Sequence, residues 1–437
     1  MLLRFSVFNH RSILDAAEFS MIAVDKERSA VRSFELLNEG VLPVAGIYGP
    51  NASGKSNLLD ALAWLGAAVS RSLRAWDEFI PRDPFRFGAG PSEPSIFEIE
   101  MMVEGVRHSY ELTVTNSEVL HEALHSYPQR KRRTIFERNG EDLQFRRGLG
   151  GLAGTRGLLT PRTLALSAAM RFDDESVTPF ARQLASIRLM GAARNPYLRG
   201  FPASISTTER WFVNHEPTLF EDINEEFTNR RDTALALLRF ADLGIGDVQI
   251  VEEEGEDARS VRSAAGTRGP RRSLRLVHKV GRQEEAFELE DESVGTRTWF
   301  RLIGPTLNAL ERGQLLLFDE LDASLHPRLS ARLVSLFQDP ATNRRGAQLV
   351  FTSHDTSLLN TLNRDEVWLT EKGVDGASRL AALAEYGGER VRQSVNIERA
   401  YLQGRFGAVP ELDQIVLRRA MGLLLGEESV RDETTPG

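Results

Sequence analysis

The sequence predicts an α/β fold with a parallel sheet at its core, and three apolar segments carry this prediction. Each segment is rich in β-forming residues and ends at a polar turn: residues 41–48 before a glycine-rich turn, 314–318 before two acids, and 348–352 before a histidine. Continuous apolar runs of this length are typical of strands buried on both faces. Residues 56–69 and 327–337 have helical apolar spacing, so strands and helices alternate as in a parallel sheet.

Composition excludes several classes of protein. The chain has 437 residues and no cysteine, with 54 Lys and Arg against 62 Asp and Glu and a net charge of −8. Without cysteine there are no disulfides, iron–sulfur sites or thiol nucleophiles. A negative chain is not a generally basic nucleic-acid coat. Because no apolar run approaches the roughly 18 residues of a membrane span, and no signal peptide pattern opens the chain, we expect a cytoplasmic protein with no membrane partner.

The strongest motif is a glycine-rich turn between a predicted strand and a predicted helix. Residues 49–56 read Gly-Pro-Asn-Ala-Ser-Gly-Lys-Ser and match G-x-x-x-x-G-K-[ST], and their flanks distinguish a P-loop from a chance turn. Lys55 would reach the β- and γ-phosphates and Ser56 would bind Mg²⁺, while backbone N–H groups cradle phosphate oxygens. We therefore predict ATP and Mg²⁺ as cofactors. The predicted binding residues of the loop are Gly49, Asn51, Ser53, Gly54, Lys55, Ser56 and Asn57.

A second motif is the apolar strand that ends in Asp319 and Glu320, which is a Walker B arrangement. We predict that Asp319 binds Mg²⁺ together with Ser56, and that Glu320 is the general base that activates water. The alternative is a strand that stops at a solvated acidic turn. The presence of a P-loop in the same chain favours the catalytic interpretation.

Two further positions are candidate contacts to the γ-phosphate. His354 ends the next apolar strand, and we predict that it is catalytic, although a single histidine is also common as a structural residue. Ser293 and Gly295 open a helix before the Walker B strand, where free N–H groups attract an anion. Ser293 is also suited to be an ordinary N-cap, and both roles are compatible.

The order of these motifs resembles the ABC-type ATPase heads of RecF and of the structural-maintenance-of-chromosomes (SMC) proteins. Several details are similar to the AAA-labelled ATPases of bacterial defence loci, of the RloA or abortive-infection type. The resemblance covers about residues 1–150 and 237–412. The segments that carry it are 9–12 (NHRS), 292–296 (ESVGT), 318–327 (FDELDASLHP), 352–355 (TSHD) and 404–410 (GRFGAVP).

The resemblance implies an ABC-type head, with a mixed β subdomain and a P-loop core, interrupted by a helical insertion. It also implies that Ser293 and Gly295 form a signature motif acting across a dimer, that residues 321–324 form a D-loop, and that His354 is the switch histidine. One element departs from the pattern, because no glutamine occurs between Asn57 and Gln129 where such heads place one. The contact to Mg²⁺ and water that this glutamine normally makes is therefore unassigned.

We expect three parts in the chain. Residues 1–156 would form the N-terminal lobe of the head, with the P-loop and β hairpins near 96–115 and 135–147. Residues 157–232 would form the projecting helical insertion. Residues 233–437 would form the C-terminal lobe with the signature, Walker B strand and switch histidine.

Two other features suggest different ligands. His121-Glu-Ala-Leu-His125 matches the zinc protease motif H-E-x-x-H, which requires a helix, but the alternation here predicts a strand. Basic clusters at 130–133 and 259–275 make DNA binding possible, although such runs are usually solvated hairpin tips. Acidic residues at 252–257 precede the second cluster and favour self-neutralisation.

Three functions compete at this point. The first, implied by the resemblance, is an ATPase that dimerises on ATP, as a homodimer or higher oligomer, and controls a separate effector such as a nuclease or toxin in antiphage defence. The second is a RecF-like clamp in DNA repair. The third is a nucleotide-gated scaffold that does not hydrolyse ATP, against which Glu320 argues.

Overall fold

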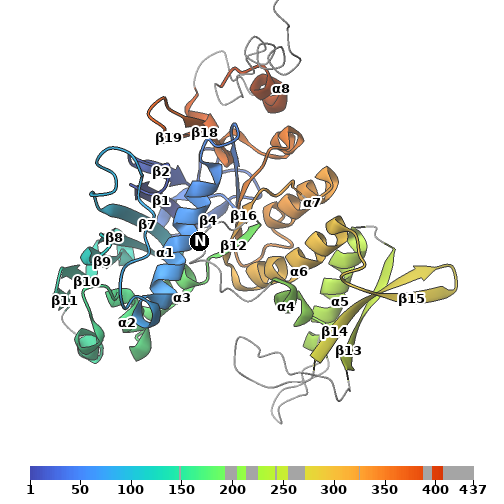
Figure 1. Ribbon diagram of the computed structural model, residues 1–437, viewed down its shortest axis with the longest axis horizontal. Helices are drawn as coiled ribbons and strands as arrows, with labels where there is room; N and C mark the ends of the chain where they lie inside the picture. Colours follow the sequence, from blue (N-terminus) through green and yellow to red (C-terminus); the bar gives the residue numbers. More distant parts are fainter. Residues whose placement is uncertain are drawn as a thin grey trace, which may run out of the picture.

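The computed structural model describes residues 1–146, 149–191, 204–212, 225–241, 244–253, 271–323, 325–386 and 396–406. Figure 1 shows helix α1 in front of the core strands. A large antiparallel sheet lies on one side of it, and a lobe of α5 and three strands lies on the other. Across the described ranges, no helix combines the length and apolar character that a membrane crossing needs.

The strands divide among four sheets. Their bounds are β1 Leu2–Phe8, β2 Ala17–Ser20, β3 Ile22–Ala23, β4 Arg32–Phe34, β5 Leu37–Val41, β6 Val44–Tyr48, β7 Ser95–Val103, β8 Val106–Val114, β9 Val119–Ser126, β10 Arg133–Asn139, β11 Asp142–Phe145, β12 Arg188–Gly191, β13 Ile245–Glu253, β14 Arg271–Val280, β15 Gln283–Glu288, β16 Leu315–Asp319, β17 Gln348–Thr352, β18 Val367–Lys372 and β19 Ser378–Ala382.

The helices pack against these sheets or against one another. The α-helices are α1 Lys55–Ala75, α2 Ala165–Ala169, α3 Thr178–Ala185, α4 Ser204–Glu209, α5 Glu225–Phe240, α6 Val294–Arg312, α7 Pro327–Gln338 and α8 Ile397–Leu402. The short 3₁₀ helices are Pro128–Arg130, Gly150–Leu158, Met170–Phe172, Thr356–Thr361, Arg364–Glu366 and Leu383–Glu385.

The core sheet has the order β12-β16-β17-β6-β18-β19, and all neighbours in it are parallel except β18 and β19. Its strands β6, β16 and β17 are buried on both faces, as the apolar runs predict. Side chains alternate between two cores: Ile47 and Leu317 face the core that contains α1, whereas Tyr48 and Phe318 face the core that contains α6 and α7. The predicted α/β class with a parallel-sheet core is confirmed.

The second large sheet is antiparallel, with the order β11-β10-β9-β8-β7-β1-β2. The predicted hairpins are present in it as β7–β8 and β10–β11. Helices α2 and α3 pack against α1, and α3 also contacts β7, so α1 lies between the two large sheets. This sheet takes the place of the β subdomain of the predicted head, and its strand pairs are all antiparallel.

Residues 157–232 contain more than helices. Besides α2, α3 and α4, they include β12, which pairs in parallel with β16 from Arg188 opposite Leu316 to Gly191 opposite Asp319. This part of the middle segment therefore completes the core sheet rather than projecting from it. β12 has only four residues, two of which are not apolar, so no sequence pattern identifies it as a strand. The expected bounds of the three parts stay a prediction.

The H-E-x-x-H motif lies on β9, so the predicted strand is confirmed. The Nε2 atoms of its two histidines lie near the carboxylate of Glu111 on β8. Arg132 donates to His125 Nε2 at 2.7 Å. Within the described residues, no group of three or more His, Asp or Glu side chains is arranged to hold a metal ion.

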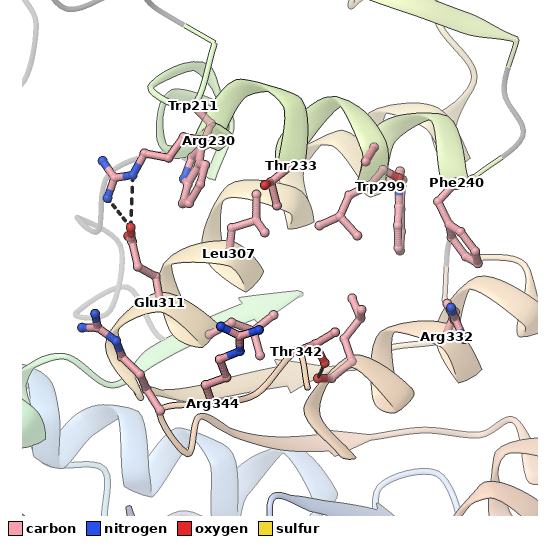
Figure 2. A pocket seen from close by; sticks show the side chains of 15 residues that line it. Trp211, Arg230, Thr233, Phe240, Trp299, Leu307, Glu311, Arg332, Thr342 and Arg344 are labelled. Atoms are coloured by element: carbon pink, nitrogen blue, oxygen red, sulfur yellow. Dashed lines mark hydrogen bonds and ion pairs between the residues drawn. The ribbon is translucent and has the colours of Figure 1, made fainter. Parts of the chain in front are cut away.

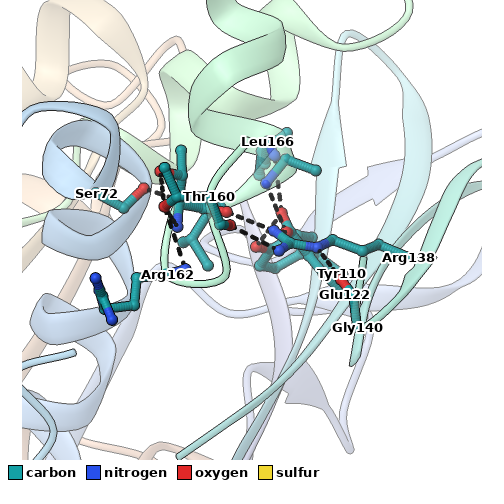
Figure 3. A network of polar contacts seen from close by, with 11 residues as sticks. Ser72, Tyr110, Glu122, Arg138, Gly140, Thr160, Arg162 and Leu166 are labelled. Carbon is teal, nitrogen blue, oxygen red and sulfur yellow. Dashed lines mark hydrogen bonds and ion pairs between the residues drawn. The ribbon is translucent and has the colours of Figure 1, made fainter. Parts of the chain in front are cut away.

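Glu122, between the two histidines, is the centre of a buried polar network (Figure 3). Its carboxylate accepts from Tyr110 Oη at 2.9 Å and from the backbone N–H groups of Ala165 and Leu166 at 2.6 and 2.8 Å. Arg138 lies 4.0 Å from it and donates to the carbonyl oxygens of Gly140, Thr160 and Thr163. The network therefore attaches the antiparallel sheet to the start of α2.

Candidate nucleotide site

The P-loop connects β6 to α1 through backbone conformations that favour glycine. Gly54, the N-cap of α1, has φ 104°, and a Cβ there would lie 2.1 Å from Ser378 Oγ. Gly49 has φ 153°, and a Cβ there would lie 2.4 Å from the carbonyl oxygen of Thr370. Both glycines of the motif are thus required by close neighbours as well as by conformation.

Lys55 points back across the loop. Its ammonium group donates to the carbonyl oxygens of Gly49 at 2.8 Å and of Pro50 at 3.0 Å. Burial lowers the pKa of Lys55, and the nearby carboxylates of Asp319 and Glu320 partly oppose that effect. The side chain is therefore a buried cation at the mouth of the loop, where phosphate oxygens are its natural partners.

Ser56 and Asp319 meet at the carboxyl end of the core sheet. Ser56 Oγ donates to Asp319 Oδ1 at 2.7 Å, and Thr352 Oγ1 donates to the same oxygen at 2.8 Å. Asp319 is 4 % exposed. A hydroxyl and a buried carboxylate oxygen in contact are a donor set that suits Mg²⁺, which prefers oxygen ligands. The residues that the motifs predict as metal ligands are therefore adjacent in the fold.

Glu320 follows Asp319 in a left-handed conformation with φ 58°, which is uncommon for a residue other than glycine. Its backbone N–H donates to Thr352 Oγ1 at 2.7 Å, which holds this turn against β17. The side chain is half-buried. The conformation directs the chain away from the sheet immediately after the metal-binding position.

His354 lies two residues after the end of β17 with an exposed side chain. Its backbone N–H donates to Asp322 Oδ1 at 3.1 Å, and Ser353 Oγ donates to the same oxygen at 2.7 Å. The predicted D-loop and the predicted switch histidine are thus tied together through Asp322. Ser324 of the D-loop segment and residues 407–410 lie outside the described residues.

Ser293 is the N-cap of α6, and its Oγ accepts from the N–H of Thr296 at 3.1 Å. The side chain of Ser293 is exposed. In the part of the chain that is described, no hydrogen bond or ion pair joins Ser293 or Gly295 to the P-loop. α6 begins just after β15, which Figure 1 shows on the far side of the molecule from α1. The structure does not bring the predicted signature to the chain's own P-loop.

Sequence reasoning missed the hydroxyl side chains that hold the loop from behind. Ser53 Oγ and Thr370 Oγ1 are hydrogen bonded at 2.6 Å. Ser378 Oγ donates to the Ser53 carbonyl oxygen at 2.6 Å and also contacts Ser12 Oγ at 2.6 Å. The segment 9–12 contributed only to the resemblance. In the structure, Ser12 Oγ also accepts a hydrogen bond from Nδ2 of Asn57, the residue that directly follows the P-loop motif.

The stretch between Asn57 and Gln129, where the expected glutamine is missing, contains two carboxylates that pair with Arg11. Arg11 Nε lies 3.1 Å from Asp60 Oδ1 on α1 and 3.3 Å from Asp83 Oδ2. Asp60 also contacts His10 Nε2 at 2.9 Å. Arg11 thus connects Asp83 to α1, the helix that starts at the P-loop, and His10 contacts the same carboxylate of α1.

These features together define a P-loop protein of the ABC and SMC-like ATPase class. Residues 44–360 match a family model described as "AAA domain, putative AbiEii toxin, Type IV TA system", and the chain belongs to that family. The match spans the P-loop, Walker B strand and His354. No curated protein matches the sequence.

Solved structures that are similar to this chain include SMC head domains. An SMC head bound to the C-terminal winged-helix domain of ScpA has 14 % identity and a TM-score of 0.43, covering 87 % of this chain and 97 % of that one. The head from Thermotoga maritima has 14 % identity and a TM-score of 0.38, covering 87 % and 98 %. A Pyrococcus furiosus head bound to a ScpA domain has 14 % identity and a TM-score of 0.42, covering 88 % and 97 %.

Proposed function

We propose that the chain binds ATP with Mg²⁺ at this loop and hydrolyses it between two copies of the head. The contact that carries the proposal is the 2.7 Å hydrogen bond from Ser56 Oγ to Asp319 Oδ1. It joins two motifs that are far apart in the sequence and that both require the same ion. Membership of the ATPase family supports the same conclusion.

Each side chain has a task that follows from its position. Lys55, now bonded to two carbonyl oxygens, would exchange them for phosphate oxygens. Ser56 and Asp319 would hold Mg²⁺, which neutralises phosphate charge when bound. Glu320 would take the proton of the attacking water, and the Thr352 hydroxyl would keep Asp319 and the Glu320 backbone in place.

The second copy follows from the place of the signature. Ser293 and Gly295 begin α6 without a contact to their own P-loop in the described residues, and Ser293 is exposed. A second head would bring this helix start to the γ-phosphate, since free N–H groups at a helix N-terminus attract anions. The site would thus be composite, with His354 beside the reacting phosphate.

We further propose that ATP-dependent pairing of heads controls a separate effector, a nuclease or toxin, in antiphage defence. The abortive-infection family supports this role. A DNA-repair clamp is a weaker candidate, because arginines of the first basic cluster of this chain, residues 130–133, already have partners within the protein. Arg130 donates to Asn38 Oδ1 at 2.8 Å, and Arg132 donates to His125. The second cluster, up to residue 270, lies outside the described residues.

Calorimetry with ATP tests the nucleotide site, with and without Mg²⁺. Wild-type protein should bind more tightly with Mg²⁺, and Asp319→Asn should lose most of that gain while still binding ATP through Lys55. Equal affinity with and without Mg²⁺ in the wild-type protein would contradict the assignment.

Phage plating on cells that express the chain with its neighbouring genes tests the defence role, because a Lys55→Ala chain should give no protection. DNA-stimulated turnover without any protection would favour the clamp.

A further inference from the structure

A cavity lies between α5, α6 and α7, away from the nucleotide site. Its volume is about 590 Å³, and its walls are mainly apolar (Figure 2). α5 supplies Leu237 and Phe240, α6 supplies Trp299 and Leu307, and Trp211 closes one end. We call this cavity the α5–α7 groove. A volume of this size holds a small molecule or several side chains of a partner.

The groove is long and cationic at its edges. Arg230 and Phe240, ten positions apart on α5, mark its two ends, which corresponds to about 15 Å of helix. The charged residues that line it are Arg230, Arg332, Arg344, Arg345 and Glu311. Arg230 is ion paired with Glu311, and Arg332 lies over the Phe240 ring at 5.0 Å. A surplus of arginines therefore surrounds an apolar floor from one end to the other.

The aromatic walls are held in fixed positions. Trp299 Nε1 donates to the Leu237 carbonyl oxygen at 2.9 Å, and Trp211 Nε1 donates to Asn308 Oδ1 at 3.2 Å. Arg230 also lies over the Trp211 ring at 5.3 Å. Rigid aromatic side chains flanked by arginines are typical of binding hot spots, because little side-chain entropy is lost when a partner arrives.

We propose that the α5–α7 groove binds an acidic amphipathic helix of a partner protein. Apolar side chains at i, i+4 and i+7 would span about 10 Å and fit along the groove, while flanking carboxylates would meet the arginines. Positive charge at both ends favours such a helix over a compact ligand with one anionic head group. Trp, Phe and Arg are also the residue types enriched at protein interfaces.

The position of the groove relative to ATP gives the proposal its consequence. Leu310 and Glu311 of α6 precede β16, and Thr342 and Arg344 precede β17, so the groove adjoins the amino ends of these strands. Asp319 and Thr352 occupy their carboxyl ends. A helix in the groove would therefore not compete with ATP, yet it would contact α6, whose other end carries Ser293. This step rests on the proposed function, with the effector as the partner.

The test uses the full chain and a synthetic 16-residue helical peptide with leucines at i, i+4, i+7 and i+11, glutamates elsewhere on its sides, and no aromatic residue. Binding is followed by tryptophan emission, since two of the five tryptophans line the groove. We expect saturable binding that weakens as salt rises. A peptide with lysine in place of glutamate should bind at least tenfold more weakly.

Substitutions locate the site. Ala236→Glu and Arg332→Glu should each weaken peptide binding at least tenfold, because Ala236 is exposed in the groove and Arg332 lines it. Arg301→Glu is the matched control, because Arg301 is an exposed arginine of α6 that does not line the groove, and it should bind as wild type. Equal binding by the groove variants and the control would overturn the proposal. So would dodecyl phosphate displacing the peptide and binding more tightly, since this would indicate a small amphiphile.

ATP turnover measured on the same samples separates the two proposals. The groove variants should keep basal turnover, because none of these residues contacts the nucleotide site. Absent turnover in all samples with intact, groove-dependent peptide binding would refute hydrolysis and leave the groove assignment standing. Normal turnover without peptide binding would refute the groove assignment alone.

Discussion

Thr352 and Asp319, which end neighbouring parallel strands, are joined by a hydrogen bond of 2.8 Å from the threonine hydroxyl to the carboxylate. The same hydroxyl accepts the N–H of Glu320 at 2.7 Å. One buried oxygen atom therefore positions both the predicted metal ligand and the backbone of the predicted base. Thr352 was no part of the predicted site.

Thr352→Val should lower kcat for ATP by about 10- to 100-fold, which corresponds to the loss of a hydrogen bond to a charged group. KM should change little because Thr352 does not face the phosphates. Thr352→Ser keeps the hydroxyl and should restore most of kcat. Steady-state kinetics on the two variants would decide, and equal losses in both would contradict the assignment of the effect to the hydroxyl.

Glu320→Gln should retain ATP affinity and lower turnover by about 10²- to 10⁴-fold, because it removes the base and keeps the shape. The ATP-bound variant should accumulate as a closed dimer. Calorimetry, a phosphate-release assay and light scattering measure the three properties. Turnover near the wild-type rate would remove Glu320 from this role.

Lys55→Ala should abolish ATP binding without unfolding the chain. Among the described residues, the Lys55 ammonium donates hydrogen bonds only to carbonyl oxygens of its own loop, so neither core loses a hydrogen bond when it is removed. Calorimetry should detect no heat of binding, and circular dichroism should give the wild-type melting curve. Unchanged affinity would contradict the P-loop assignment.

Ser293→Arg should spare ATP binding by one head and block both ATP-dependent pairing and hydrolysis. The large side chain would occupy the start of α6, where the γ-phosphate of the other head is expected. Mixing this variant with Lys55→Ala should restore partial activity, since one interface of the mixed dimer keeps one intact P-loop facing one intact signature. Wild-type turnover by Ser293→Arg alone would refute action across a dimer.

Arg138→Met should destabilise the fold by about 3–5 kcal/mol, because it removes the cation beside the buried Glu122 carboxyl group and leaves three carbonyl oxygens without their donor. The matched control is Arg182→Met. Arg182 pairs with Asp173 at 2.7 Å on the open surface, and an exposed pair contributes about 0–1 kcal/mol. Urea unfolding measures both variants, and equal losses would show that the Glu122 network is not a source of stability.

Glu122 should also give stability a pH dependence. Burial raises its pKa above the ordinary value of 4.5, against the lowering effect of its donors Leu166 and Ala165 and of Arg138. The folded chain thus keeps this proton to higher pH than the unfolded chain. The free energy of unfolding should therefore fall as pH rises from about 4.5 through the folded pKa. Glu122→Gln should flatten this slope in urea titrations, and an unchanged slope would exclude Glu122.

The sequence was sufficient for the central strands β6, β16 and β17 of the core sheet and for the motif residues at their carboxyl ends, because continuous apolar strands and a phosphate-binding loop are strong local signals. Ser56 and Asp319 were predicted to share an ion, and they are in contact. β12 was missed because four residues carry no periodicity. Ser12, Thr352 and Ser378 were missed because serine and threonine are common everywhere. Only the fold brings Ser12 and Ser378 to the P-loop and Thr352 to Asp319.

The pairing of β6 with β17 has a consequence for synthesis on the ribosome. Ala45 is hydrogen bonded into the sheet opposite Val350, about 300 residues later. At about 5–20 residues per second, β6 waits about 15–60 s for its neighbour. The antiparallel sheet, complete by Phe145, is able to form long before that. During this interval the nascent chain exposes an apolar strand whose partners have not yet been synthesised, and exposed strands of this kind are prone to aggregation.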